Sequence, residues 1–272
     1  MNHGAVTVPL YRLPLSGDEM ISLSRLREIL GKHPIYFIVP AGLHVPDAFL
    51  QGEMIVRFPD NYFTYPFGYN RLLMTSRFYR CFKQFSHILI YQLDCLVFRD
   101  ELDDWCSKNY DFIGAPWLDE YRDQAVNAPA WKVGNGGFSL RKVSTALKIL
   151  STRVKRGSFY PMPPAHFPKQ TFIQWFFSNI YNRFKQHLHF WTVEDELHNY
   201  AENEDRFWAI DVININSRFT KPDVDEAFGF AFEVHPRECL AKTDGRIPFG
   251  CHAWWKYDRE LWESILTKSA LP

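Results

Sequence analysis

Residues 87–100 decide the fold of this chain and read His87-Ile88-Leu89-Ile90-Tyr91-Gln92-Leu93-Asp94-Cys95-Leu96-Val97-Phe98-Arg99-Asp100. The pattern predicts a buried strand that ends by presenting two polar side chains, Gln92 and Asp94, among apolar neighbours. A carboxylate in such surroundings is costly to desolvate unless a cation or a strong hydrogen-bond donor compensates its charge. Asp94 is therefore the first candidate for a functional residue.

The segments before this stretch predict alternating strands and helices. Residues 5–11 are typical of a first strand, and Ser16-Gly17-Asp18-Glu19 predicts the capping box of a helix that runs to about Leu30 and is closed by Gly31. Residues 34–39 are apolar almost throughout, which is typical of a strand buried on both faces of a parallel sheet. Five further elements are predicted: a strand at 54–57, a helix at about 69–82, a short helix capped by Asp100 that ends at Ser107, a strand at 111–117 and a helix at 141–150.

The composition indicates a globular α/β protein. The chain has 272 residues, of which 46% are hydrophobic and 17% aromatic, enough for one large core. The sequence contains no apolar run of about 18 residues, and its start lacks the pattern of an export signal, so we expect a cytoplasmic protein. Five cysteines without a C-x-x-C pair favour reduced, mostly buried thiols over a disulfide framework or a zinc site.

The net charge of zero conceals a segregation of charge along the chain. Residues 124–193 contain ten Lys and Arg but no Asp or Glu, which leaves 21 basic and 31 acidic residues elsewhere. The middle of the chain could therefore face an anionic partner, such as a diphosphate or a membrane surface, or it could neutralise the rest of the molecule. Within it, residues 171–191 predict an aromatic, basic helix that either lies in a membrane interface or packs in the core. No nucleic-acid partner is expected.

A glycine-rich turn, Val133-Gly134-Asn135-Gly136-Gly137-Phe138-Ser139-Leu140-Arg141, is the second notable stretch. It matches neither G-x-G-x-x-G nor the P-loop, so neither nucleotide-binding fold follows from it. Three glycines in four positions would let a sugar lie against the backbone, and a turn that binds no ligand is the alternative.

Three further residues could support chemistry at a sugar carbon that carries a diphosphate leaving group. Asp94 and His252 together could hold a divalent cation, Mn²⁺ or Mg²⁺, and the mixed oxygen and nitrogen ligands suit Mn²⁺ better. Asp205 or Glu204 could accept the proton of an acceptor hydroxyl as the general base. Adjacent carboxylates at a helix start are also common as solvated residues without any catalytic role.

Five ordered motifs resemble an uncharacterised bacterial domain family that is often found near polysaccharide-synthesis enzymes and looks like the GT-A glycosyltransferases. The motifs lie at residues 91–102, 110–117, 133–141, 203–205 and 248–254, and the resemblance extends from about Val6 to Tyr257. It implies an α/β fold with a mixed, mostly parallel central sheet flanked by helices. We expect one GT-A-like domain over 1–272, with a nucleotide-sugar-binding half at 1–118 and an acceptor-side half at 119–272 that carries a basic aromatic insertion at about 151–193.

The resemblance also implies roles for particular residues. GT-A enzymes carry a D-x-D motif at the end of a central strand; its second Asp matches Asp94, but its first matches Gln92, a poor cation ligand. His252 matches a late histidine that completes the metal site, and Glu204-Asp205 matches the acidic pair of the acceptor site. The remaining assignments are Arg71 as a donor-phosphate contact and, on the acceptor side, Gly136, Gly137 and Trp117.

The leading hypothesis is a glycosyltransferase that moves a sugar from a nucleotide sugar to a glycan or lipid-linked acceptor at the cytoplasmic side of a membrane. Asp205 favours inversion at the anomeric carbon, while retention stays open. The substitution by Gln92 keeps a second class open, a noncatalytic carbohydrate- or nucleotide-binding module. The third alternative, a nucleotidyltransferase, is disfavoured because no basic glycine-rich signature follows the first strand.

Overall fold

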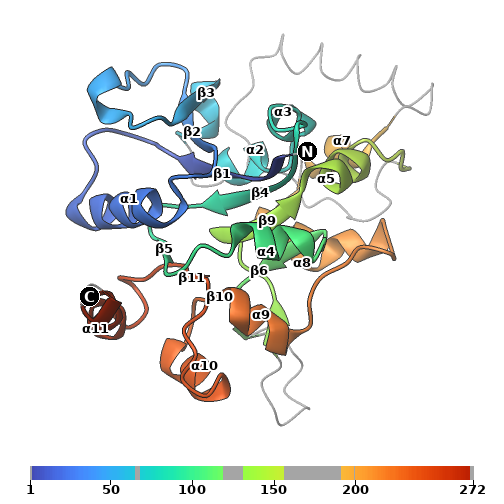
Figure 1. The fold of residues 1–272 in the computed structure, drawn as a ribbon. Coiled ribbons are helices and arrows are strands. Elements are labelled where there is room, and N and C mark those ends of the chain that lie inside the picture. The colour runs from blue at the N-terminus through green and yellow to red at the C-terminus, as the bar shows by residue number, and fades with distance from the viewer. Residues whose placement is uncertain (1, 65–67, 119–130, 156–190, 199, 270–272) are drawn as a thin grey trace.

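The computed structural model describes residues 2–64, 68–118, 131–155, 191–198 and 200–269 (Figure 1). Its central six-stranded sheet has the order β3 (Met54–Phe58), β2 (Ile35–Pro40), β1 (Asn2–Pro9), β4 (Phe85–Tyr91), β9 (Phe138–Lys142) and β6 (Phe112–Gly114). The first four strands are parallel neighbours, and β9 runs antiparallel to both β4 and β6. The mixed, mostly parallel central sheet is therefore confirmed.

Two smaller sheets and a set of short helices complete the described structure. In one sheet β11 (Gly250–Cys251) lies between β10 (Ala231–Phe232), to which it is parallel, and β5 (Leu96–Val97), to which it is antiparallel; the other pairs β7 (Pro116–Leu118) with β8 (Trp131–Val133). The described α-helices are α1 (Gly17–Leu30), α2 (Gly68–Leu72), α3 (Ser76–Arg80), α4 (Leu102–Ser107), α5 (Val143–Leu150), α7 (Val193–Leu197), α8 (Glu204–Ala209), α9 (Val224–Phe230), α10 (Pro236–Lys242) and α11 (Arg259–Ser269).

Helices cover both faces of the central sheet, as the continuous apolar strands predict. Along β4, Ile88 and Ile90 point into a core shared with α3, α5 and α8, whereas Leu89 and Tyr91 point into a second core shared with α1 and α4. All four side chains are fully buried. Because successive side chains of a strand point to opposite faces, a strand covered on both sides must be apolar at every position. Figure 1 shows β1 and β4 at the centre of this arrangement.

Several local predictions are confirmed and several are wrong. The capping box of α1 is present: the Glu19 amide donates to the Ser16 hydroxyl at 3.2 Å, and the Ser16 amide donates to the Glu19 carboxylate at 2.7 Å. The helix predicted at 69–82 is instead two short helices: α2 ends at Leu72, whose carbonyl accepts from the Thr75 hydroxyl at 2.8 Å, and Thr75 caps α3 by accepting from the Phe78 amide. The predicted strand at 111–117 is split into β6 and β7.

Two charged residues lie in elements other than those predicted. Asp100 does not cap α4, because its carboxylate contacts the side chains of Lys32 and His33 at 2.7 and 2.8 Å. Arg141 belongs to strand β9 and not to the following helix, which begins at Val143. The helix predicted at 171–191 lies outside the described residues except for its last residue. Among the described helices, none is long and apolar enough to cross a membrane.

Candidate active site

Asp94 lies in a tight turn directly after the central strand β4. The Gln92 amide donates to the Gly137 carbonyl at 2.9 Å, and the Cys95 amide donates back to the Gln92 carbonyl at 2.9 Å, which closes the turn. Asp94 therefore stands at the carboxyl end of a parallel strand, the edge where open α/β sheets bind their ligands. The Gln92 side chain is half-buried.

The small sheet brings His252 next to Asp94. In the register of β11 and β5, Cys251 pairs with Leu96, so the residues that follow Cys251 run alongside those that precede Leu96. The Trp254 amide donates to the Asp94 carbonyl at 3.0 Å and fixes this approach. Residues more than 150 positions apart thus meet because a two-residue strand pairs with another, which no local sequence pattern encodes.

His252 lies between two carboxylates. Its Nε2 atom is 3.3 Å from Asp94 Oδ2, and its Nδ1 atom is 2.8 Å from Glu233 Oε1. Burial would lower the pKa of His252, but the Asp94 and Glu233 carboxylates raise it to about 10. Burial would likewise raise the pKa of Asp94, yet the charge of His252 holds it below its ordinary value. Without a bound cation, the imidazolium itself therefore balances the acidic cluster.

The donor atoms of this cluster fit a divalent cation. Asp94 Oδ1 and His252 Nε2 are buried, and neither has a hydrogen-bond partner among the residues that the structure describes; the 3.3 Å contact between the two side chains is not aligned as a hydrogen bond. Buried polar atoms are rarely left unpaired unless a ligand or an ion completes them. Cys95 supplies a third nearby ligand atom. Burial raises the pKa of its thiol well above the ordinary value, and its Sγ donates to the Gly137 carbonyl at 3.3 Å.

The glycine-rich turn lies against both His252 of the Asp94 cluster and Glu204 of the acidic pair, and its glycines leave room for these side chains. A Cβ atom at Gly137 would lie 2.2 Å from His252 Nε2, and one at Gly136 would lie 2.2 Å from Glu204 Oε1. A Cβ at Gly134 would meet the ring of Trp117 at 2.1 Å. The space that the missing side chains leave is thus filled by side chains of this chain. The acceptor roles of these glycines and of Trp117 stay predictions.

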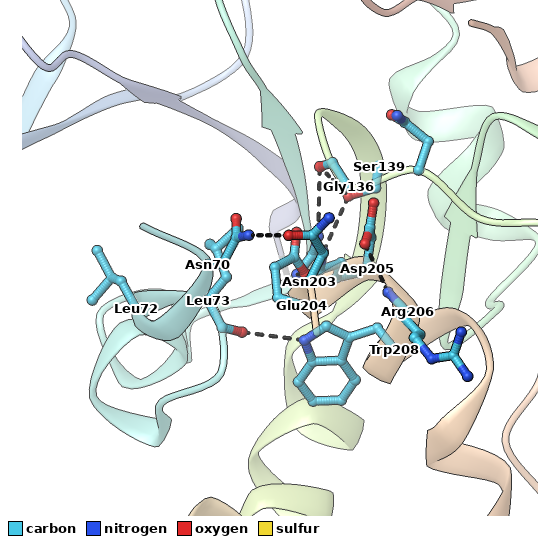
Figure 2. A network of polar contacts seen from close by, with 12 residues as sticks. Asn70, Leu72, Leu73, Gly136, Ser139, Asn203, Glu204, Asp205, Arg206 and Trp208 are labelled. Atoms are coloured by element: carbon cyan, nitrogen blue, oxygen red, sulfur yellow. Dashed lines mark hydrogen bonds and ion pairs between the residues drawn. The ribbon is translucent and has the colours of Figure 1, made fainter. Parts of the chain in front are cut away.

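A buried ion pair holds the acidic pair against the turn. Arg141, which is 2% exposed, contacts both carboxylate oxygens of Glu204 at 2.8 and 3.0 Å and also donates to Ser139 and Tyr79. Burial would lower the pKa of Arg141, but the Glu204 carboxylate raises it above its usual range, so the guanidinium keeps its charge. The Glu204 carboxylate is therefore already paired with a buried guanidinium. Figure 2 shows it with Asp205 beside Gly136 at the start of α8.

Asp205 has the properties of a proton acceptor. Burial raises its pKa above the ordinary value, the Glu233 carboxylate adds to the rise, and the Arg206 amide, which donates to it at 2.8 Å, together with Arg141 and His252 opposes it. The charges of Glu233 and His252, two residues beside Asp94, thus also act on the pKa of Asp205. A carboxylate with a raised pKa is a stronger base at neutral pH.

Arg71 lies on the α8 side of the site. It belongs to α2, where the neighbouring Asn70 amide donates to the Asn203 side chain at 2.9 Å and so joins α2 to the start of α8 (Figure 2). The Trp208 indole, which donates to the Leu73 carbonyl at 3.2 Å, makes a second link. The predicted phosphate contact of Arg71 is neither supported nor opposed by these contacts.

Sequence reasoning missed four residues of the site, namely Tyr11, Asn135, Arg141 and Glu233. Tyr11 follows the end of β1 and is 47% exposed. Burial, and then the Asp94 and Glu204 carboxylates, raise its pKa. The carboxyl-end rule for parallel strands could have found it. Glu233 and Arg141 left no such signal, because their partners are distant in the sequence.

Comparisons with known proteins agree with this architecture. The family described as Protein of unknown function (DUF5672) matches residues 53–252. No curated protein matches the chain. Among solved structures, the galactosyltransferase LgtC in complex with donor and acceptor sugar analogs is 10% identical, with a TM-score of 0.50 over 98% of this chain and 97% of LgtC. That likeness shows the fold, which is GT-A-like.

A second similar structure is longer than this chain. The apo form of the glycosyltransferase GlyE from Streptococcus pneumoniae TIGR4 is 12% identical and has a TM-score of 0.43 over 100% of this chain. The chain spans 61% of the length of GlyE.

Proposed function

The chain belongs to the DUF5672 family, and we propose that it is a glycosyltransferase that moves a sugar from a nucleotide-diphosphate sugar to a glycan or lipid-linked acceptor. The observation that carries the proposal is the pair of buried ligand atoms at the carboxyl end of β4, Asp94 Oδ1 and His252 Nε2, which have no hydrogen-bond partner among the described residues. The carboxylate of Asp205, whose pKa burial raises, supports it. The GT-A-like fold and the LgtC complex with donor and acceptor sugar analogs support it.

Asp94 and His252 are the residues that would hold the cation of such an enzyme. Their oxygen and nitrogen atoms suit Mn²⁺, and Gln92, at the first position of the D-x-D motif, is left to hydrogen-bond the nucleoside. A divalent cation bound there would neutralise the negative charge that develops on the departing diphosphate. To bind it, His252 must release the proton from Nε2, so cation binding should displace a proton.

Asp205 acts as the general base in this proposal. Its carboxylate accepts the proton of the acceptor hydroxyl while the acceptor oxygen forms a bond to the anomeric carbon and the bond from that carbon to the phosphate oxygen breaks. The electron pair of the broken bond leaves with the diphosphate. A direct displacement of this kind inverts the anomeric configuration, and NMR of the freshly formed product tests it: a product with the donor's configuration would exclude the role of Asp205 as the base of a direct displacement.

Tyr11 and Arg71 complete the donor side. The half-exposed ring of Tyr11 packs edge-to-face on Phe63 and Tyr69, with centroids 5.9 Å apart in both pairs, and so offers a fixed aromatic surface to a nucleoside base. Arg71 is proposed to contact a donor phosphate, for which a guanidinium is well suited.

A noncatalytic binding module is the second candidate, because Gln92 replaces a carboxylate in the D-x-D motif. Isothermal titration with UDP, GDP, CDP and dTDP, each with and without Mn²⁺, separates the two. A glycosyltransferase should bind at least one nucleotide in a Mn²⁺-dependent manner, and Asp94→Asn should lose that dependence. Asp104→Asn, which changes an exposed aspartate on α4, is the matched control. Binding of glycans alone, with no response to nucleotide and Mn²⁺, would favour the module.

We further propose that the protein is cytoplasmic and makes peripheral contact with an anionic membrane, on the basis of the acid-free segment at 124–193. Co-sedimentation with anionic vesicles should show binding that weakens as salt is raised. Absence of binding at low salt would instead favour neutralisation of that segment within the molecule.

A further inference from the structure

Glu233 is a residue of the site that lies in none of the sequence motifs. It directly follows β10, and β10 pairs in parallel with β11 so that Phe232 lies opposite Cys251. The next residues along the two strands are Glu233 and His252, and the His252 amide donates to the Phe232 carbonyl at 2.9 Å. The sheet itself therefore places the Glu233 carboxylate beside the imidazole of His252.

The contact between them determines which ring nitrogen can bind a metal. Glu233 Oε1 lies 2.8 Å from His252 Nδ1, and the two side chains are 15% and 14% exposed. A carboxylate only accepts hydrogen bonds, so this contact requires the proton to be on Nδ1. The lone pair of the neutral ring is then on Nε2, the atom that is buried without a hydrogen-bond partner beside Asp94.

Asn135 favours the opposite arrangement. Its Oδ1 atom accepts from the Phe138 amide at 3.1 Å, which directs Nδ2 toward His252 Nδ1 at 2.9 Å. An amide NH₂ only donates, so by itself Asn135 would place the lone pair on Nδ1 and the proton on Nε2. Glu233 and Asn135 thus compete for one ring nitrogen, and the charge of Glu233 makes its hydrogen bond the stronger one.

We infer that Glu233 is a positioning residue that keeps the proton of His252 on Nδ1 and so leaves Nε2 available to a divalent cation. The inference rests on the proposed function, because it concerns the same cation site. Carboxylates that orient metal-binding histidines in this way strengthen metal affinity about 10- to 100-fold.

Mn²⁺ binding to the nucleotide-free protein, followed by EPR of the free ion, tests the role of Glu233. Glu233→Ala should weaken binding about 10- to 100-fold, and the ¹⁴N coupling of a coordinated imidazole in the pulsed EPR spectrum of the bound ion should disappear. Glu233→Gln keeps an oxygen that can accept from Nδ1 and should lose less. Glu238→Ala removes the same charge from an exposed site on α10 and should bind as the unmodified protein does.

A second substitution distinguishes the hydrogen bond from a general effect on folding or charge. In the Glu233→Ala/Asn135→Asp protein, a new carboxylate faces Nδ1 from the other side, while its other oxygen can still accept from the Phe138 amide. Mn²⁺ affinity and the ¹⁴N coupling should return. Failure of this rescue, or an equal loss in Glu238→Ala, would overturn the role of Glu233. If the unmodified protein binds no Mn²⁺, the cation site itself is overturned as well. Of these outcomes, only this one would also contradict the proposed function.

Discussion

Asp205, the proposed general base, is a buried carboxylate whose ionisation costs stability. Burial raises its pKa, which means that the folded protein resists ionising it at the pH where a base is needed. Because the folded pKa exceeds the unfolded one, stability is greatest below the ordinary pKa of an aspartate and falls as the pH rises through the raised value. Above that value the cost of the charge is constant.

Asp205→Asn should therefore lower kcat and stabilise the fold together. The amide keeps an oxygen for the Arg206 N–H but cannot accept a proton, so we expect kcat to fall about 10²- to 10⁴-fold. Chemical denaturation at several pH values should show a gain in unfolding free energy that is absent at acid pH and grows as the pH rises through the folded pKa of Asp205. A variant that is inactive and also less stable at neutral pH would contradict this account.

The pH dependence of transfer should report the same group. Since the base must be deprotonated, kcat/KM should rise with pH through the raised pKa of Asp205, and the acidic limb should lie above the ordinary range of an aspartate. Any residual activity of Asp205→Asn should lack that limb. The same limb in both proteins would assign it to another group.

At the scale of single elements, the glycine-rich turn is tightly enclosed by its neighbours. Gly137→Ala should displace the His252 ring, because the new Cβ would lie 2.2 Å from Nε2, and Mn²⁺ affinity should fall at least tenfold. Gly17→Ala is a suitable control, since a Cβ there has no neighbour within 4 Å. Titration with Mn²⁺ measures both, and unchanged binding in Gly137→Ala would show that the ring has room to move.

The ion pair between Arg141 and Glu204 links β9 to α8, and removing only one of its two side chains should be costly. Glu204→Ala leaves the guanidinium buried without a counter-charge, so we expect a loss of about 3–5 kcal/mol of unfolding free energy. Replacing both residues by methionine should restore much of the loss, because a packed apolar pair costs little. Denaturant titrations measure the free energy of unfolding of both variants. Arg237→Ala, which breaks an exposed ion pair, is the control and should lose much less of it.

At the scale of the whole molecule, the site draws on segments from all parts of the chain. Tyr11, Asp94, the turn at 134–137, Asp205 and His252 come together only in the complete fold. Binding at such a site should stabilise the whole fold: Mn²⁺ with its nucleotide at about 100 times Kd should add about 2.7 kcal/mol. Thermal denaturation should show a rise of the melting temperature by about 5–10 °C, and Asp94→Asn should lose the part that depends on Mn²⁺.

Much of the architecture could be read from the sequence because local physics sets it. Strands β2 and β4 of the central sheet are predicted by their nearly continuous apolar runs, and Ser16 and Glu19 predict the capping box of α1. The helix predicted at 69–82 was wrong because Thr75 competes for the backbone, and Asp100 was assigned as a cap although distant partners hold it. Local patterns fail where a residue's strongest partner is remote.

The sequence by itself determined that a carboxylate, Asp94, ends a buried strand, that His252 and the pair at 204–205 are chemically suited to join it, and that the sheet is mostly parallel. Only the tertiary structure decided that Glu204 is bound to Arg141 while Asp205 is not, and that Glu233 lies on the far side of His252 from Asp94. The reason is physical: a strand's burial follows from its own residues, whereas the partner of a buried charge follows from strand register across the fold.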